Sequence, residues 1–119
     1  MATKSNYSIK IEERGQIIVV LVEGFLDDTA GQTLSSEVGK KLEENFKRFV
    51  FDFKNVRNVS SPAVAAILDL SEKITDNHAG KIIISGLSDL NLKIFEMVGI
   101  FLYADACATT QEAEVKASL

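Results

Sequence analysis

The sequence predicts an α/β protein in which helices pack on a mixed sheet of four or five strands. Three observations lead to this prediction. Runs rich in β-branched residues alternate with segments whose apolar residues recur at helical spacing. A very short connection joins the first two runs, which favours an antiparallel pair. The chain of 119 residues holds no linker, repeat or low-complexity stretch, which predicts a single domain over 1–119. The expected order is β-β-α-β-α-β-α-(β)-α.

A hairpin is expected at the start of the chain. Tyr7–Glu13 alternates in polarity and predicts a half-buried strand. Arg14 and Gly15 form the turn. Gln16–Gly24 is a β-branched apolar run and predicts a more buried strand.

The next segment predicts an amphipathic helix. Asp27 or Asp28 supplies its N-cap, and an acidic residue suits the positive end of the helix dipole. The apolar stripe recurs every four residues, at Ala30, Leu34, Val38, Leu42 and Phe46.

Two strands and an intervening helix follow. Arg48–Phe53 and Lys81–Gly86 are short apolar runs typical of buried strands. Pro62–Ile74 predicts the helix between them, and Asn77–Gly80 predicts the turn back to the sheet. A strand–helix–strand unit of this kind requires parallel pairing.

The C-terminal third predicts two more helices. In the first, Ser88–Val98, one side holds Leu90, Ile94, Met97 and Val98. Gly99 is its expected C-cap. Ile100–Ala104 predicts a last short strand, and Thr109 with Glu112 forms a capping-box pattern for the terminal helix.

Composition argues against several classes of function. The formal net charge is −4, so the chain lacks the basic footprint of a protein that binds nucleic acid or anionic lipid. No apolar run approaches the roughly 20 residues that span a bilayer. The polar start, MATKSNYS, lacks the apolar segment of a signal peptide. A lone cysteine, Cys107, forms no internal disulfide. These features predict a cytoplasmic protein.

Residues suited to catalysis or to metal and cofactor binding are scarce. The only histidine, His78, lies in a predicted turn, which argues against a catalytic triad or a histidine-based zinc site. Cys107 has no partner at CxxC spacing, and the chain lacks glycine-rich nucleotide fingerprints. For Asp27 and Asp28, helix capping is the better explanation. We therefore expect no enzyme activity, no cofactor and no metal site.

The stretch NVSSPAV, residues 58–64, is the strongest functional candidate. Proline is favoured at the first helical position and holds the residue before it in the extended backbone that an N-cap needs. Ser61 as N-cap and Pro62 as the first helical residue thus explain one of the two serines as a helix-start signal.

The residues after Pro62 allow a second interpretation. Ala63 to Leu68 is apolar on every side, which is typical of a docking surface. Phosphate on a serine at its rim would add about −1.5 to −2 charges. A helix start tolerates that anion, whereas a docked partner would be repelled by it. Capping and a phosphorylation switch both stay open from the residues alone.

Three segments resemble the STAS domain of the anti-sigma factor antagonist type, and together they cover most of the chain. VEGFLDDTAGQTLSSEV (22–38) is similar to that family's G-x-L-D-x-x-T/S-A-x-x-L. FVFDFKNVRNVSSPAVAAIL (49–68) is similar to its strand, loop and D-S-[ST]-G-L-G-x-L. LSDLNLKIFEMVGIFLYADACATTQEA (87–113) is similar to its helix ending in x-x-x-G-L, its short strand and its final E-A. The order and spacing of the motifs make the resemblance specific, and it implies a STAS-type sheet.

The resemblance implies a regulatory binding protein. Ser61, with Ser60 as the alternative, matches the serine that the family's partner kinase phosphorylates. The implied partners are an anti-sigma factor serine kinase with a histidine-kinase-like ATPase fold and a PP2C-type phosphatase. The implied partner-binding residues are Asp27, Ser60, Ser61, Pro62, Ala63, Val64 and Ala65. The alternative function is a non-phosphorylated STAS scaffold in a larger signalling assembly.

The chain departs from the family motif at four positions. Ser60 stands where the motif has Asp, and Pro62 where it has Ser or Thr. Ala63 and Ala65 stand where it has glycine, and alanine restricts the close approach of a partner backbone. A carboxylate before the acceptor could position the hydroxyl for a kinase, and Ser60 lacks that group.

Overall fold

The observed elements follow the predicted order. The computed structural model describes residues 6–119, so part of the polar N-terminal stretch, residues 1–5, lies outside the described residues. The strands and helices are β1 (Tyr7–Arg14), β2 (Ile17–Leu26), α1 (Asp28–Glu43), β3 (Arg48–Val59), α2 (Ser61–Glu72), β4 (Lys81–Ser85), α3 (Asp89–Val98), β5 (Asp105–Cys107) and α4 (Thr110–Ser118). A π-helical turn, η1 (Lys73–Asn77), extends α2, and a 3-10 turn, η2 (Ile100–Leu102), follows α3.

The five strands form one mixed sheet in the order β1-β2-β3-β4-β5. β1 pairs antiparallel with β2 through a tight turn at Gly15, whose φ of 62° suits glycine. The remaining neighbours all pair in parallel. The predicted α/β class and the mixed sheet are confirmed.

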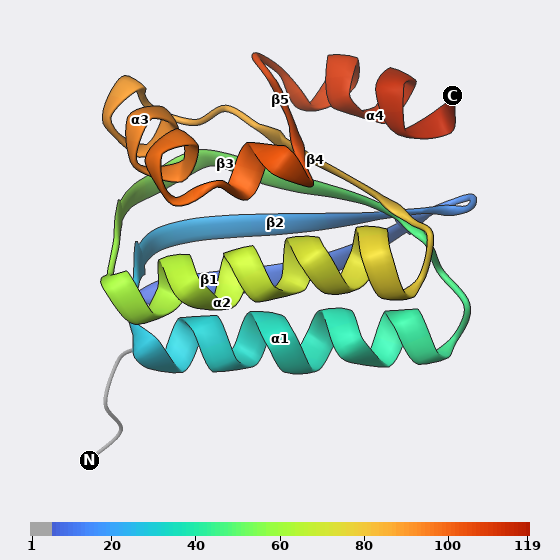
Figure 1. Ribbon diagram of the computed structural model, residues 1–119, viewed down its shortest axis with the longest axis horizontal. Helices are drawn as coiled ribbons and strands as arrows, with labels where there is room; N and C mark the ends of the chain where they lie inside the picture. Colours follow the sequence, from blue (N-terminus) through green and yellow to red (C-terminus); the bar gives the residue numbers. More distant parts are fainter. Residues whose placement is uncertain (1–5) are drawn as a thin grey trace.

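The two faces of the sheet are covered differently. α1 and α2 lie side by side on one face, where they and the facing strand side chains form the main core (Figure 1). On the other face, α4 packs the small side chains of Ala113 and Ala117 against Val19, Val50 and Ile83. Because alternate residues of a strand point to opposite faces, both cores draw on the same strands.

Two boundaries in the first half of the chain differ most from prediction, while β1 and β2 differ by one or two residues. Phe46 is not part of the α1 stripe, because the helix ends at Glu43 and the chain turns at Asn45, where φ is 71°. β3 continues past Phe53 to Val59, because the segment keeps pairing with the far end of β2. Its many polar residues face solvent there, which is why the sequence resembled a loop.

Two further differences concern the segment around α3. Ile100–Ala104 is not a strand, because the chain continues to turn after the left-handed Gly99 and pairs with β4 only at Asp105–Cys107. The C-cap at Gly99 is confirmed. The predicted stripe does share one side of α3, but Leu90, Met97 and Val98 on it are exposed. Packing on the core decides this, because Phe95, on another side of the helix, fills the buried position.

Candidate functional site

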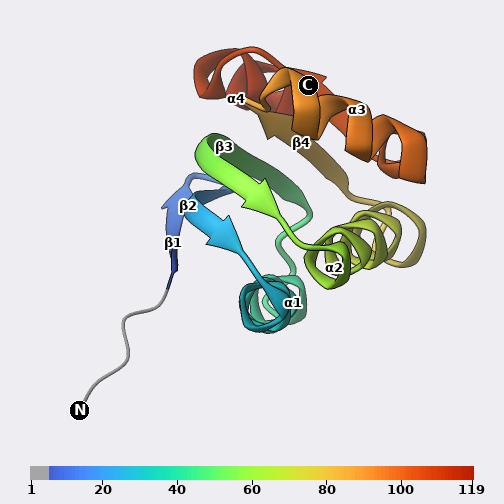
Figure 2. The same cartoon turned by 90° about the vertical axis from the view of Figure 1, so that its left-hand side faces the viewer.

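The predicted site residues lie at one edge of the sheet, where the parallel strands β2 and β3 end. Leu26 and Val59 are register partners at these two ends. The Ser60 backbone N–H donates to the Leu26 carbonyl oxygen at 2.8 Å. Asp27 and Ser61 each follow one member of that bonded pair, so the structure brings them together. Figure 2 shows this edge, with α1 and α2 seen end-on from their first turns.

Asp27 is the N-cap of α1. Its backbone is extended, and its Oδ1 accepts a hydrogen bond from the Ala30 backbone N–H at 2.9 Å. The cap satisfies one of the amides that a helix start leaves without a partner. Of the two predicted candidates, Asp27 and Asp28, the first is confirmed as the cap. Its carboxylate is half-buried, and therefore one side of it still faces solvent at the site.

Ser60, not Ser61, is the N-cap of α2. The Ser60 Oγ accepts from the Ala63 N–H at 3.2 Å, and the Ser60 carbonyl accepts the first helical bond from Val64 at 2.9 Å. The prediction of Ser61 as cap with Pro62 as first helical residue was wrong by one position. Proline is tolerated at the second position as well, because the first amides of a helix have no intrahelical acceptor. The bond between Ser60 and Leu26 decides the register.

Ser61 is the first helical residue of α2, and its side chain is exposed. Within residues 6–119, no group hydrogen-bonds to the Ser61 hydroxyl. Pro62 and Ala65 are exposed beside it. We call these three exposed residues the α2 surface. It offers a free hydroxyl at a helix start, flanked by small apolar groups.

The other predicted partner-binding residues, Ala63 and Val64, point inward. Ala63 is fully buried and Val64 nearly so, because both belong to the main core. Ala63 also packs against α1 at Gly31, where an added Cβ would lie only 3.2 Å from the Ala63 Cα and 3.1 Å from the Ala66 Cβ. A glycine inside the helical pattern was the sequence signal for this close approach.

Other candidate chemistry stays dispersed. His78 and Cys107 are half-buried in separate segments. In the described part of the chain, no three His, Cys, Asp or Glu side chains gather as metal ligands would. None of the helices within 6–119 combines the length and the apolar character that crossing a bilayer requires.

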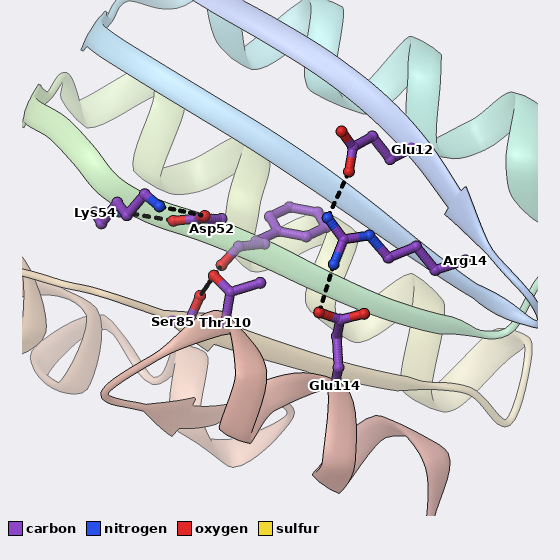
Figure 3. Close-up of polar contacts among 8 residues, drawn as sticks. Glu12, Arg14, Asp52, Lys54, Ser85, Thr110 and Glu114 are labelled. Carbon is purple, nitrogen blue, oxygen red and sulfur yellow. Dashed lines mark hydrogen bonds and ion pairs between the residues drawn. The ribbon is translucent and has the colours of Figure 1, made fainter.

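A polar cluster that sequence reasoning missed ties α4 to the sheet (Figure 3). Arg14 donates to the carboxylates of Glu12 and Glu114, each at 2.7 Å. Both bonds raise the pKa of the Arg14 guanidinium, and the bond to Glu12 has the larger effect. Arg14 and Glu114 lie 100 residues apart in sequence, so no local pattern indicates the pair.

The same face holds a buried carboxylate. Asp52 accepts from the Lys54 backbone N–H at 3.1 Å, and its other oxygen lies 3.8 Å from the Lys54 Nζ. Nearby, the hydroxyls of Ser85 and Thr110 are 2.9 Å apart and join β4 to the start of α4. The contact between Ser85 and Thr110 holds α4 against the sheet, whereas the contacts of Asp52 lie within β3. Neither involves the residues of the α2 surface.

Comparison with known proteins identifies a domain family and structures of the same fold. The model of the STAS domain matches residues 8–113. SpoIIAA in its phosphorylated form, described as a Bacillus cell fate determinant, is 19% identical with a TM-score of 0.74, over 92% of this chain and 98% of that chain. An anti-sigma factor antagonist from Mycobacterium paratuberculosis is 15% identical with a TM-score of 0.83, over 100% of both chains. A variant of RsbS from Moorella thermoacetica is 14% identical with a TM-score of 0.79, over 92% of this chain and 94% of that chain.

Proposed function

This chain belongs to the STAS domain family, and we propose that it is a regulatory binding protein switched by phosphorylation of Ser61. Unmodified, it binds an anti-sigma factor serine kinase of the histidine-kinase-like ATPase class. Phosphorylated, it releases that kinase, and a PP2C-type phosphatase restores binding. The observation that carries the proposal is the exposed, unbonded hydroxyl of Ser61 at the first position of α2.

The choice of Ser61 over Ser60 rests on hydrogen bonding. The Ser60 hydroxyl accepts the cap bond of α2, and the Ser60 backbone N–H donates to Leu26, so a kinase that bound Ser60 would compete with the cap bond. The Ser61 side chain is exposed and can enter a kinase active site without unfolding any of the described structure. A phosphate at this position also lies beside the positive end of the α2 dipole, which tolerates the anion in the free protein.

Release follows from the surroundings of Ser61. The exposed groups next to it, Pro62 and Ala65, are apolar, and Asp27 brings a carboxylate to the same edge. A partner that packs on the α2 surface would have to desolvate a doubly charged phosphate next to apolar groups. A cost of about 3 kcal/mol would lower affinity roughly a hundredfold.

One observation favours a second function, that of a non-phosphorylated STAS scaffold. Ser60 is a neutral cap at the position where the related motif has Asp, so the acceptor has no carboxylate in front of it. The same α2 surface would then bind a partner without being modified. Neither function involves catalysis by this chain.

Phosphorylation is tested by incubating the purified chain with candidate kinases of this class from the same genome and ATP, followed by intact mass. We expect the wild type and Ser60→Ala to gain one phosphate and Ser61→Ala to gain none. Label lost in Ser60→Ala but kept in Ser61→Ala would assign the acceptor to Ser60. No label with any of these kinases would favour the scaffold.

Binding is tested with the same kinases by calorimetry. Phosphorylated Ser61 should bind up to about a hundredfold more weakly. Ser61→Asp should weaken binding by less, because one carboxylate carries less charge than a phosphate. Ser61→Ala should bind like the wild type, because it removes only an unbonded hydroxyl. Equal binding by Ser61→Asp and wild type would remove the α2 surface from the interface.

A further inference from the structure

α3 carries an apolar stripe that faces solvent. Four side chains form what we call the α3 stripe: Leu90, Met97, Val98 and Leu102, with 63%, 85%, 42% and 83% of their surface exposed. The first three follow helical spacing. Leu102 lies beside Gly99 at the end of the helix, where a Cβ on Gly99 would be 3.5 Å from the Leu102 Cδ1. Ile94, which lies between Leu90 and Met97 on this side, is half-buried against the main core, so the exposed side chains flank it. Scattered exposed apolar residues are ordinary, whereas several gathered on one helix mark an interaction surface.

The stripe is not a frayed or loosely held segment. On its buried side, α3 places Phe95 edge-on against Phe53, with 5.9 Å between ring centroids. Ser88 caps the helix by accepting from the Asn91 N–H at 3.1 Å, and Gly99 ends it. The helix is therefore packed on one side and capped at both ends, and the stripe lies on its solvent-facing side.

The stripe lies on the same side of the molecule as the α2 surface. β4 ends at the same sheet edge as β3, and α3 begins directly after it. The Asn91 side-chain amide reaches the Arg57 carbonyl at 3.5 Å, in the stretch of β3 that leads into α2. Figure 2 shows α3 and the first turn of α2 facing the viewer together.

Area decides what covers the stripe. Three side chains on a ten-residue helix and a fourth, Leu102, in the η2 turn after it form a patch of at most a few hundred Å². A stable interface needs about 800 Å² on each partner, so a pair of stripes alone would not hold two copies together. The α2 surface, with three small exposed residues, is too small by itself as well. One partner that covers both regions and the surface between them buries more area than either region alone.

We infer that the α3 stripe is a second contact region for the kinase that binds the α2 surface, an inference that rests on the proposed function. The matching surface on the kinase is an apolar groove with residues of both charges at its rim. Around the two regions, the exposed carboxylates of Asp28, Asp89 and Glu96 are matched by the exposed cations of Lys54, Arg57 and Lys93. Phosphorylation of Ser61 then disrupts one region and leaves the other intact.

The test uses two matched double variants. Leu90→Ser with Met97→Ser alters the stripe. Val115→Ser with Leu119→Ser is the control on α4, because these side chains are 64% and 83% exposed, close to the 63% and 85% of the first pair. All four positions are exposed, so urea midpoints close to wild type are expected for both variants. Binding is measured by calorimetry with the kinases that phosphorylate or bind the wild type.

We expect the stripe variant to bind about tenfold more weakly, about 1.4 kcal/mol, and the control to bind like the wild type. Unchanged binding by the stripe variant, together with weakened binding by Ser61→Asp, overturns the inference and leaves the proposed function standing. A wild-type dimer in sedimentation velocity that the stripe variant abolishes would assign the stripe to a second copy and also overturns it. If no kinase binds the wild type, the proposed function and this inference fall together.

Discussion

α2 and α3 begin alike and end up in opposite roles. Each follows a parallel strand at the same edge of the sheet, and each is capped by a serine that accepts from an amide three residues on, Ser60 from Ala63 and Ser88 from Asn91. α2 turns its apolar residues into the main core. α3 turns most of its apolar side to solvent and reaches the core through Phe95.

The difference lies in what each helix packs against. α2 lies beside α1 over the middle of the sheet, so two sides of it are covered (Figure 1). Among the described elements, α3 has no α-helix packed along it in this way. It contacts β3 at Phe53 and Arg57, and the η2 turn that follows α3 itself. Helical periodicity specifies a common side, but the neighbouring elements determine whether that side is buried.

The largest effect is expected from removing the fully buried aromatic ring of α3. Phe95→Ala deletes a fully buried ring that contacts Phe53 edge-on, and such a deletion costs about 3–5 kcal/mol of unfolding free energy. Met97→Ala, on the exposed side of the same helix, should change stability by less than about 0.5 kcal/mol. Urea denaturation measures both. Equal losses would mean that α3 buries its stripe in solution.

A smaller effect is expected where α1 and α2 approach each other. Gly39→Ala, in open space on α1, should stabilise the helix by about 0.5–1 kcal/mol. Gly31→Ala gains the same propensity but forces a Cβ to within 3.2 Å of Ala63, and overpacking costs about 1–3 kcal/mol. Gly31→Ala should therefore be the less stable of the two in thermal or urea unfolding. A gain at Gly31 that matched the gain at Gly39 would show that α2 shifts freely on α1.

The two serines before Pro62 should differ by about one helix cap. Ser60→Ala removes the acceptor of the Ala63 amide and should lower the unfolding free energy by about 1 kcal/mol. Ser61→Ala removes an exposed hydroxyl and should stay within about 0.5 kcal/mol of wild type. The reverse order would restore Ser61 as the cap and weaken its assignment as phosphate acceptor.

The smallest effect concerns the link from the end of the α3 segment back to α2. The Tyr103 hydroxyl donates to the Glu72 carboxylate at 3.1 Å, and this hydrogen bond raises the pKa of Tyr103 above its ordinary value of about 10. The bond stabilises the protonated phenol, so its contribution to stability is present below pH of about 10 and is lost as the pH rises through the folded-state pKa. Glu72→Gln should lower the pKa of Tyr103.

Phenolate absorbance against pH measures that shift. Tyr103→Phe assigns the transition, because Tyr7 is the only other tyrosine of the chain. A Tyr103 titration that is the same in wild type and Glu72→Gln would mean that η2 does not stay in contact with α2.

The sequence by itself determined most of the strands and helices, though not the last strand, which was expected at Ile100–Ala104 and lies at Asp105–Cys107. Alternating and β-branched runs indicated β1, β2 and β4, and the stripe of Ala30, Leu34, Val38 and Leu42 indicated α1. Capping signals at Gly99 and Thr109 were likewise sufficient, and those at the start of α1 left Asp27 and Asp28 as the two candidates. These features depend on residues within one or two helical turns of each other, so a local pattern contains them. The order of elements followed from them.

Only the tertiary structure decided the details on which the candidate site depends. Ser60 rather than Ser61 caps α2, because its N–H is held by the Leu26 carbonyl at the end of the neighbouring strand. Leu90 and Met97 face solvent because Phe95 occupies the contact with Phe53. In each case the partner lies more than 30 residues away in sequence. Long-range partners of this kind leave no periodic signal, because their position is fixed by sheet pairing and side-chain packing rather than by spacing along the chain.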